Sequence, residues 1–293
     1  VDPPGPGHRS RAGGSRAAPV SPPAAALALA LLVLLIPAFG LSPLTAIVAA
    51  SARNGIGARG TLPWRLSKDM AYFRAITRHV VEPEHDDDVM RRAGYARQSV
   101  PLKNAVIMGR HTWDSIPPRF RPLRDRINVV VSTTMTQHDL GLAEPDDDTL
   151  IARSLEDAVT LLEERRSWRY TQRPACAGSA LAHTFIIGGA ALYHHALTST
   201  SDHWYLDGLL VTRIQEPADL HEKCDVFFTE FRTPPQIEWE QRLFQGPCPT
   251  PGTWTLASPD THVARFPCIA PGDVAPGLEE QGMLFQFQYW QRT

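Results

Sequence analysis

The 293-residue chain has few cysteines, and their spacing argues against a metal or redox motif. Cys176, Cys224, Cys248 and Cys268 form no CxxC pair or other metal-ligand spacing, so we predict no metal site from them. We expect free thiols in a reducing compartment, and a Cys248–Cys268 disulfide stays open as an alternative. The chain also lacks an excess of basic residues. Its net charge of -2 argues against nucleic acid as a partner.

The chain has no apolar run long enough to predict a membrane span. The longest run, Ala24–Ile36, has thirteen residues, whereas a transmembrane helix needs about 20. A segment rich in Pro, Gly, Ser and Arg precedes it, so residues 24–41 have the form of a signal peptide. We expect residues 1–43 to be an extension, either without structure of its own or a targeting segment, and we expect a cytoplasmic protein.

The stretch from Leu44 to Phe73 predicts a strand, a glycine-rich loop and the start of a helix. Leu44–Ala50 is an apolar run of strand length. The loop Asn54–Trp64 contains three glycines, which give its backbone conformational freedom. Ser67 is placed to cap the helix that follows.

Asp69 does not fit the pattern of that helix. It stands four residues before Phe73 and seven before Ile76, and so it shares their apolar face. Two readings are open. Asp69 is either a first-turn residue, wetted by solvent and favoured by the helix dipole, or a carboxylate at the bottom of an apolar pocket, which is costly unless a donor meets it. The second reading predicts a site for a cationic or amide-like ligand.

Strands alternate with helices along the rest of the chain, which is typical of an α/β domain. The expected strands are residues 104–108, 126–132, 150–152, 184–187 and 204–214, with helices after residues 109, 154 and 189. The alternating runs 237–244 and 283–290 predict an antiparallel hairpin. Polar or proline-rich segments near 82–101, 137–149, 168–182 and 246–281 are interpreted as insertions. The acidic triplet at 86–88 is interpreted as a solvated loop rather than a metal site.

Two strand-to-helix turns are suited to binding phosphate. Gly109-Arg110 and Gly188-Gly189 each follow an apolar strand and precede a helix, where backbone N–H groups and the helix dipole favour an anion. The spacing is not GxGxxG, so it does not predict a Rossmann fingerprint. Arg126 leads another strand, and it suits either a surface position or a bidentate clamp on a carboxylate.

Taken in order, these segments resemble dihydrofolate reductase. The resemblance rests on the motifs IVAAS, NGIG, LPWRL, VIMGRHTWDSIP, RPLRDRINVVVS, FIIGGAALY, VTRI and CDVFF, and it extends from Leu44 to the C-terminus between the insertions. It implies one α/β domain with a mixed, mostly parallel eight-stranded sheet flanked by about four helices. It also implies a monomeric, antifolate-binding enzyme that uses NADPH to reduce 7,8-dihydrofolate to tetrahydrofolate for one-carbon metabolism and thymidylate and purine synthesis.

The resemblance also implies roles for particular residues. The catalytic group comprises Asp69, which bonds the pterin ring, together with Trp64, Thr212 and Tyr193. The substrate pocket comprises Ile47, Asp69, Met70, Phe73, Ser115, Ile116, Leu123, Arg126 and Ile187, with Arg126 on the glutamate carboxylate. The NADPH site comprises Ala49, Ile56, Gly57, Gly109, Arg110, His111, Thr112, Ser132, Thr133, Arg153, Gly188, Gly189, Ala190, Ala191 and Leu192. In the family a cis peptide joins the glycine pair, and no metal is involved.

Some positions depart from the family pattern. The acid is Asp69, as in bacterial members, whereas the insertions look eukaryotic and of fungal type. Thr133 stands where many eukaryotic members have an arginine for the 2′-phosphate, which leaves Arg110 or Arg153 to select NADPH over NADH. Two other functions stay open: a pyrimidine reductase of riboflavin synthesis on a similar fold, and a membrane-tethered relative that binds pteridine or NADPH.

Overall fold

The computed structural model describes residues 41–81, 91–92, 94–142, 144, 146–170, 178–217, 219–242, 248–249 and 252–293. The apolar run Ala24–Ile36, the acidic triplet at 86–88 and Cys176 lie outside these ranges, so the expectations for them stay predictions. Within these ranges, no helix combines the length and the apolar character that crossing a membrane requires.

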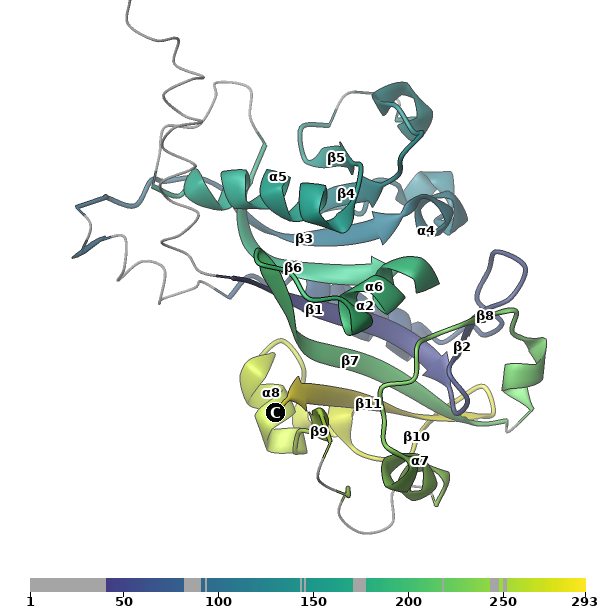
Figure 1. Ribbon diagram of the computed structural model, residues 1–293. Coiled ribbons are helices and arrows are strands. Elements are labelled where there is room, and N and C mark those ends of the chain that lie inside the picture. The colour runs from purple at the N-terminus through teal and green to yellow at the C-terminus, as the bar shows by residue number, and fades with distance from the viewer. Residues whose placement is uncertain are drawn as a thin grey trace, which may run out of the picture.

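A mixed sheet forms the centre of the molecule, with eight strands in the order β10-β11-β7-β1-β6-β3-β4-β5 (Figure 1). They are β1 (Ser42–Ser51), β3 (Leu102–Gly109), β4 (Ile127–Val131), β5 (Thr149–Ala152), β6 (Ala180–Gly188), β7 (Trp204–Glu216), β10 (Leu278–Glu280) and β11 (Met283–Arg292). The pairings from β7 to β5 are parallel, whereas β11 runs antiparallel to β7 and β10. β9 (Trp254–Leu256) also pairs with β11, and β2 (Gly55–Gly57) pairs with β8 (Val226–Phe227) apart from the main sheet. The expected mixed, mostly parallel sheet is confirmed.

Six α-helices lie in the described part of the chain, compared with the four or so that the resemblance implied. They are α2 (Ser67–Arg78), α4 (Arg110–Ser115), α5 (Leu155–Ser167), α6 (Ala190–Thr198), α7 (Pro234–Gln241) and α8 (Pro259–Arg265). Short 3₁₀ helices cover Pro118–Phe120, Gln137–Leu140, Leu220–Lys223 and Pro271–Val274. In Figure 1, α5 and α6 lie in front of the sheet and α2 lies behind it.

β3 shows how the sheet divides the hydrophobic core in two. Successive side chains of a strand point to opposite faces. Ala105 and Ile107 therefore join the core beneath α5 and α6, whereas Val106 and Met108 join the core beneath α2 and α4. All four are fully buried. Burial on both faces explains why this strand has a continuous apolar sequence instead of an alternating one.

The prediction of a strand at residues 237–244 is wrong, because the segment belongs largely to α7. Thr233 and Gln236 form a reciprocal capping box at the start of this helix, in which Gln236 Oε1 accepts from the Thr233 N–H at 2.8 Å. Two prolines follow Thr233, and proline suits the first helical positions. These start signals prevail over the alternation of apolar residues that follows them. β11 pairs with β7, β9 and β10 instead.

Two smaller expectations also need correction. Ser67 is the first residue of α2, and Leu66 holds the cap position without a side-chain hydrogen bond. The segment 246–281, which we interpreted as an insertion, contains β9, α8 and β10. Cys248 and Cys268 are free thiols, so the disulfide alternative is wrong.

Candidate active site

The carboxyl ends of the central parallel strands meet at one edge of the sheet, where ligands bind in open α/β folds. β3 ends at Gly109 and β6 ends at Gly188, and a helix follows each strand. A cis peptide joins Gly188 to Gly189. A methyl group at Gly188 would lie 3.1 Å from Thr112 Oγ1, and one at Gly109 would lie 3.6 Å from the Gly189 nitrogen. The three glycines and Thr112 thus form a cradle in which backbone is exposed to close approach.

Asp69 lies in the first turn of α2 and is only 5% exposed. Its Oδ1 accepts a hydrogen bond of 2.7 Å from the buried hydroxyl of Thr212 on β7. The solvent-wetted reading of Asp69 is therefore wrong. Burial raises the pKa of Asp69 to about 6, while the Thr212 hydrogen bond lowers it and the charge of Glu280 raises it further. A carboxylate that titrates this close to neutral pH is a candidate functional group.

Two aromatic side chains belong to the same region. Tyr193 on α6 is buried and donates a hydrogen bond of 2.6 Å to the carbonyl oxygen of Ile47 on β1. Burial and the charge of Asp69 raise the pKa of Tyr193, so its phenol stays protonated at neutral pH. Trp64 is also buried, and its indole Nε1 has no acceptor among the residues that the structure describes. A buried donor without a partner is costly, which favours a bound ligand or water at this position.

Arg126 is a second buried charge, with 6% of its surface exposed. Its Nη1 donates to Thr77 Oγ1 at 2.9 Å and its Nε donates to the carbonyl of Arg124 at 3.1 Å, so both acceptors are neutral. Arg126 forms no salt bridge among the described residues. The neighbouring acid, Asp125, pairs with Arg78 instead. Burial lowers the pKa of Arg126 to about 10. The surface-charge reading is wrong, and the guanidinium is available to an anionic ligand.

The remaining residues assigned to the substrate pocket differ in burial. Ile47 is buried, Phe73, Ile116, Leu123 and Ile187 are half-buried, and Met70 and Ser115 are exposed. The Phe73 ring lies 5.8 Å from the guanidinium carbon of Arg126, so the apolar and charged parts of the expected pocket are neighbours. Met70 is 47% exposed, which fits the rim of a pocket and not its floor.

The residues assigned to the adenosine phosphates gather around the turn that follows β4. Ser132 is buried, and its Oγ accepts from the N–H groups of Thr134 and Met135. Arg153 donates through Nη1 to the carbonyls of Ser132 and Met135, at 2.9 Å each. The exposed Arg110 donates to Thr134 Oγ1 at 3.3 Å. Two guanidinium groups therefore meet at one turn, and Arg153 is already engaged with the backbone.

The other residues assigned to the cofactor line the same edge or its border. Ala49, Ile56, Gly57, Thr112, Gly189, Ala190 and Leu192 are half-buried, whereas His111, Thr133 and Ala191 are exposed. Ala49 is on β1, Ile56 and Gly57 are on β2, and Ala190, Ala191 and Leu192 begin α6.

Comparison with known proteins identifies the family. The sequence matches the family model of dihydrofolate reductase over residues 43–81 and 96–243. The dihydrofolate reductase of Cryptococcus neoformans is 32% identical over 263 residues, which are 84% of this chain and 93% of the relative. That of Saccharomyces cerevisiae is 34% identical over 265 residues, 86% of this chain and 98% of the relative. That of Pneumocystis carinii is 38% identical over 185 residues, 63% and 73% of the two chains. This chain belongs to the dihydrofolate reductase family.

Membership in the dihydrofolate reductase family implies an oxidoreductase that acts on a small molecule with a nicotinamide cofactor. The single α/β fold that we expected agrees with membership in this family. The alternative of a riboflavin-pathway reductase is disfavoured, because these relatives carry the name dihydrofolate reductase. The membrane-tethered alternative depended on residues 1–43, nearly all of which lie outside the described ranges.

The loop Asn54–Trp64 is held by a buried cluster of polar side chains that we did not predict. Asn54 Oδ1 accepts from Arg213 Nη1 at 2.8 Å and from Arg232 Nη2 at 3.1 Å. Its amide nitrogen donates to Glu230 at 2.9 Å. Glu240 forms salt bridges with both arginines. One signal was present in the sequence: Arg213 interrupts an apolar strand, and a charge within such a strand needs a buried partner.

The middle of the same loop is fixed by backbone contacts. β2 pairs with β8, the Arg59 N–H donates to Asp225 Oδ2 at 2.8 Å, and the Asp225 N–H donates to the carbonyl of Gly57 at 3.0 Å. The loop is thus attached at its start and its middle, next to the strand ends that form the site.

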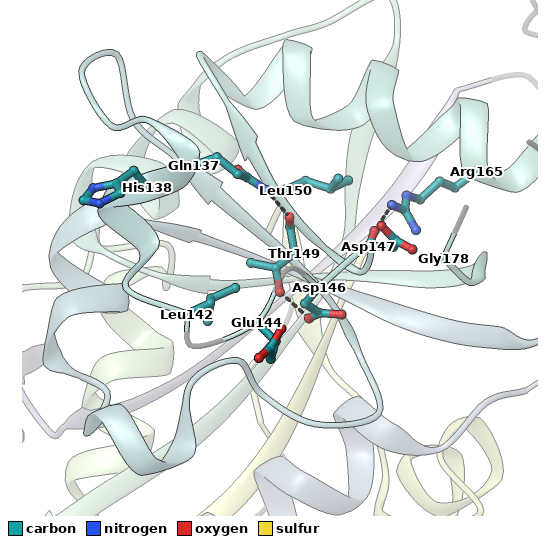
Figure 2. Close-up of a pocket in the computed structure, with 10 residues that line it drawn as sticks. All are labelled: Gln137, His138, Leu142, Glu144, Asp146, Asp147, Thr149, Leu150, Arg165 and Gly178. Atoms are coloured by element: carbon teal, nitrogen blue, oxygen red, sulfur yellow. Dashed lines mark hydrogen bonds between the residues drawn. The ribbon is translucent and has the colours of Figure 1, made fainter. Parts of the chain in front are cut away.

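A separate hollow of about 500 Å³ lies beside β5, between the insertion at 137–149 and Arg165 of α5 (Figure 2). Several of its polar groups already bond one another. Thr149 donates to Asp146, Gln137 donates to the Thr149 carbonyl, and Arg165 donates to the Asp147 carbonyl. No group of three or more potential metal ligands occurs in the described residues. This hollow therefore supplies no candidate active site.

Proposed function

We propose that this chain catalyses the NADPH-dependent reduction of 7,8-dihydrofolate to 5,6,7,8-tetrahydrofolate. The observation that carries the proposal is the buried Asp69 carboxylate, held by Thr212 and titrating near pH 6. A buried carboxylate recognises a planar heterocycle that offers two N–H donors, and the 2-amino and N3 groups of a pterin are such a pair.

The substrate is bound at both ends in this proposal. Asp69 accepts from the pterin, and Phe73, Ile116 and Leu123 supply apolar contacts to the ring and the benzoyl group. Arg126 holds the glutamate carboxylate of the tail, because it is buried and its hydrogen bonds to described residues are all to neutral groups. Charge-assisted bidentate bonds between guanidinium and carboxylate are stronger than neutral ones.

The cradle of Gly109, Gly188, Gly189 and Thr112 fits a nicotinamide dinucleotide. A Cβ at Gly188 would fill the space beside Thr112 Oγ1, so the glycines keep it open for a pyrophosphate at the start of α6. Ile187 and Tyr193 would border the nicotinamide. Arg110 would hold the 2′-phosphate, while Arg153 shapes the turn around Ser132.

The bound cofactor supplies the hydride, and the protein supplies placement and electrostatics. Asp69 orients and polarises the pterin but does not itself protonate N5, and water carries that proton. The loop Asn54–Trp64 excludes bulk water from the site, and the free indole N–H of Trp64 is suited to hold one ordered water. Tyr193 keeps its proton and positions the edge of β1 through the Ile47 carbonyl.

Loss of NADPH absorbance tests this function directly. Purified protein should oxidise NADPH when 7,8-dihydrofolate is added and not when a pyrimidine intermediate of riboflavin synthesis is added. The rate should fall when a tail-less diaminopyrimidine antifolate competes for Asp69. Turnover of the riboflavin-pathway pyrimidine alone would overturn the proposal. A monomeric state and a cytoplasmic location stay predictions, for which size-exclusion chromatography and cell fractionation are the measurements.

A further inference from the structure

The first turn of α2 carries Asp69 but has no cap from its own neighbourhood. Leu66 occupies the cap position in an extended conformation and offers no side-chain acceptor. The first N–H groups of an α-helix have no partner within the helix and must be satisfied by other groups. The first turn is therefore where an external acceptor has most effect on the position of Asp69.

Glu280, more than 200 residues away in the sequence, satisfies these groups. Its Oε1 accepts from the N–H of Ser67 at 2.7 Å and from the Ser67 hydroxyl at 2.5 Å. Its Oε2 accepts from the N–H of Lys68 at 2.9 Å. The Lys68 ammonium in turn donates to the backbone carbonyl of Glu279 at 3.1 Å. One carboxylate thus occupies the position of a helix cap.

The backbone around Glu280 explains how it reaches α2. Glu280 pairs with Met283 across the β10–β11 hairpin, and Gln281 and Gly282 connect the strands with φ values of 53° and 73°. Two central residues with positive φ are typical of a tight hairpin turn that matches the twist of its strands. The turn fixes Glu280 at the end of β10, and the long β11 strand anchors the hairpin to the main sheet.

A second contact from the same C-terminal part holds the middle of α2. The hydroxyl of Tyr72 shares a hydrogen bond of 2.8 Å with His262 Nε2 on α8. The Tyr72 ring also stacks on Phe287 of β11, with centroids 4.0 Å apart. Asp69 lies between these two attachments, so the segment after residue 246 holds the N-terminal half of this helix.

We propose that Glu280 is a positioning residue that holds the first turn of α2, and with it the Asp69 carboxylate, in register with the substrate pocket. The inference rests on the proposed function for its effect on turnover. The match to the family model ends at residue 243, so Glu280 lies outside the residues that define the family here.

Glu280 also acts on Asp69 through its charge. The hydrogen bonds from Ser67 and Lys68 lower the pKa of Glu280, so it is ionised at neutral pH and raises the pKa of Asp69. The other groups that face Asp69 are the Thr212 hydroxyl from β7, Tyr72 from its own helix and Tyr193 from α6. Both tyrosines are neutral at neutral pH, because their pKa values are raised. Among the described residues, Glu280 is therefore the charged group that shifts the titration of Asp69.

The test compares Glu280→Ala with Glu279→Ala, which removes the same charge one residue away without opening the cap. The pKa of Asp69 is read from the ¹³C resonance of its carboxyl carbon in ligand-free protein. We expect Glu280→Ala to lower this pKa and Glu279→Ala to leave it closer to wild type. At a pH where Asp69 is ionised in both proteins, Glu280→Ala should weaken a diaminopyrimidine inhibitor roughly fivefold, the scale of a lost helix cap.

Glu280→Gln separates charge from hydrogen bonding, since it keeps an acceptor for α2 but loses the charge. Glu280→Gln should bind the inhibitor more tightly than Glu280→Ala does, while the pKa of Asp69 stays below its wild-type value. Added salt should reduce the difference in Asp69 pKa between Glu280→Gln and wild type. The same Asp69 titration and inhibitor affinity in Glu280→Ala and Glu279→Ala would overturn the inference. If wild-type protein fails to turn over dihydrofolate, the proposed function fails, whereas the Asp69 titration still decides the role of Glu280.

Discussion

Replacing Asp69 by Asn keeps the size of the side chain and removes a buried charge. Burial raises the pKa of Asp69 from its ordinary value of 3.8 to about 6, so the folded protein holds this proton more tightly than the unfolded chain. Wild type therefore loses stability as the pH rises from the lower value through the higher one. The full shift corresponds to about 3 kcal/mol, at about 1.36 kcal/mol per pKa unit.

The Asn variant has no such titration, which makes the stability difference depend on pH. Its free energy of unfolding relative to wild type should rise by about 2 kcal/mol between about pH 4.5 and pH 8. That rise corresponds to a gain of about 4–8 °C in relative melting temperature for a chain of this size. Turnover of dihydrofolate at neutral pH should fall at least ~10²-fold, about 2.7 kcal/mol of transition-state stabilisation. Part of the loss should return at low pH, where the substrate arrives protonated at N5.

The assay is urea unfolding at both pH values together with NADPH oxidation. Asp207→Asn is the control, because Asp207 is another largely buried acid of raised pKa that accepts a 2.7 Å bond from a threonine hydroxyl, Thr45; unlike Asp69, it also has a cation beside it, with Arg265 Nη2 3.6 Å from its Oδ2. It should change stability with the same sign and leave turnover within about threefold. A stability difference that does not vary with pH would refute the buried charge at Asp69. Turnover of Asp69→Asn within about threefold of wild type would refute its role in the reaction.

Three further predictions follow from the same geometry. Arg126→Leu should weaken ligands that carry the glutamate tail by about 2–4 kcal/mol and leave a tail-less diaminopyrimidine unchanged; equal weakening of both would make Arg126 structural. Arg110→Ala should raise the Michaelis constant for NADPH more than that for NADH, and an unchanged ratio in steady-state kinetics would move the 2′-phosphate contact to Arg153. Glu240→Ala should destabilise the fold by about 3–5 kcal/mol in urea unfolding, because it leaves Arg213 and Arg232 buried without this acid, and a loss below about 1 kcal/mol would contradict that account.

The sequence was sufficient to predict the central strands, because each is an apolar run bounded by glycine or polar residues. It was misleading at residues 237–244, where apolar alternation suggested a strand. The capping box of Thr233 and Gln236 lies just before that run, and local start signals of this kind decide the first turn of a helix. Reading the residues before the run would have favoured a helix.

The long-range partners could not be read from the sequence. Nothing near Glu280 in the chain shows that its carboxylate reaches Ser67 and Lys68. The same holds for Asn54, which binds two arginines from distant segments. Composition and periodicity describe a residue's own element, whereas these contacts depend on which elements become neighbours in the folded sheet.

Buried charges among the described residues differ in whether another charge compensates them, and the difference favours one position for the ligand. Arg213 meets Glu240 and Asn54, so its charge is compensated within the fold. Asp69 meets the neutral Thr212 hydroxyl, and Arg126 meets the neutral Thr77 hydroxyl. Asp69 and Thr77 are eight residues apart on α2, a rise of about 12 Å along the helix. An uncompensated acid and an uncompensated base at this separation favour one elongated ligand, with N–H donors at one end and a carboxylate at the other, which is the form of a folate.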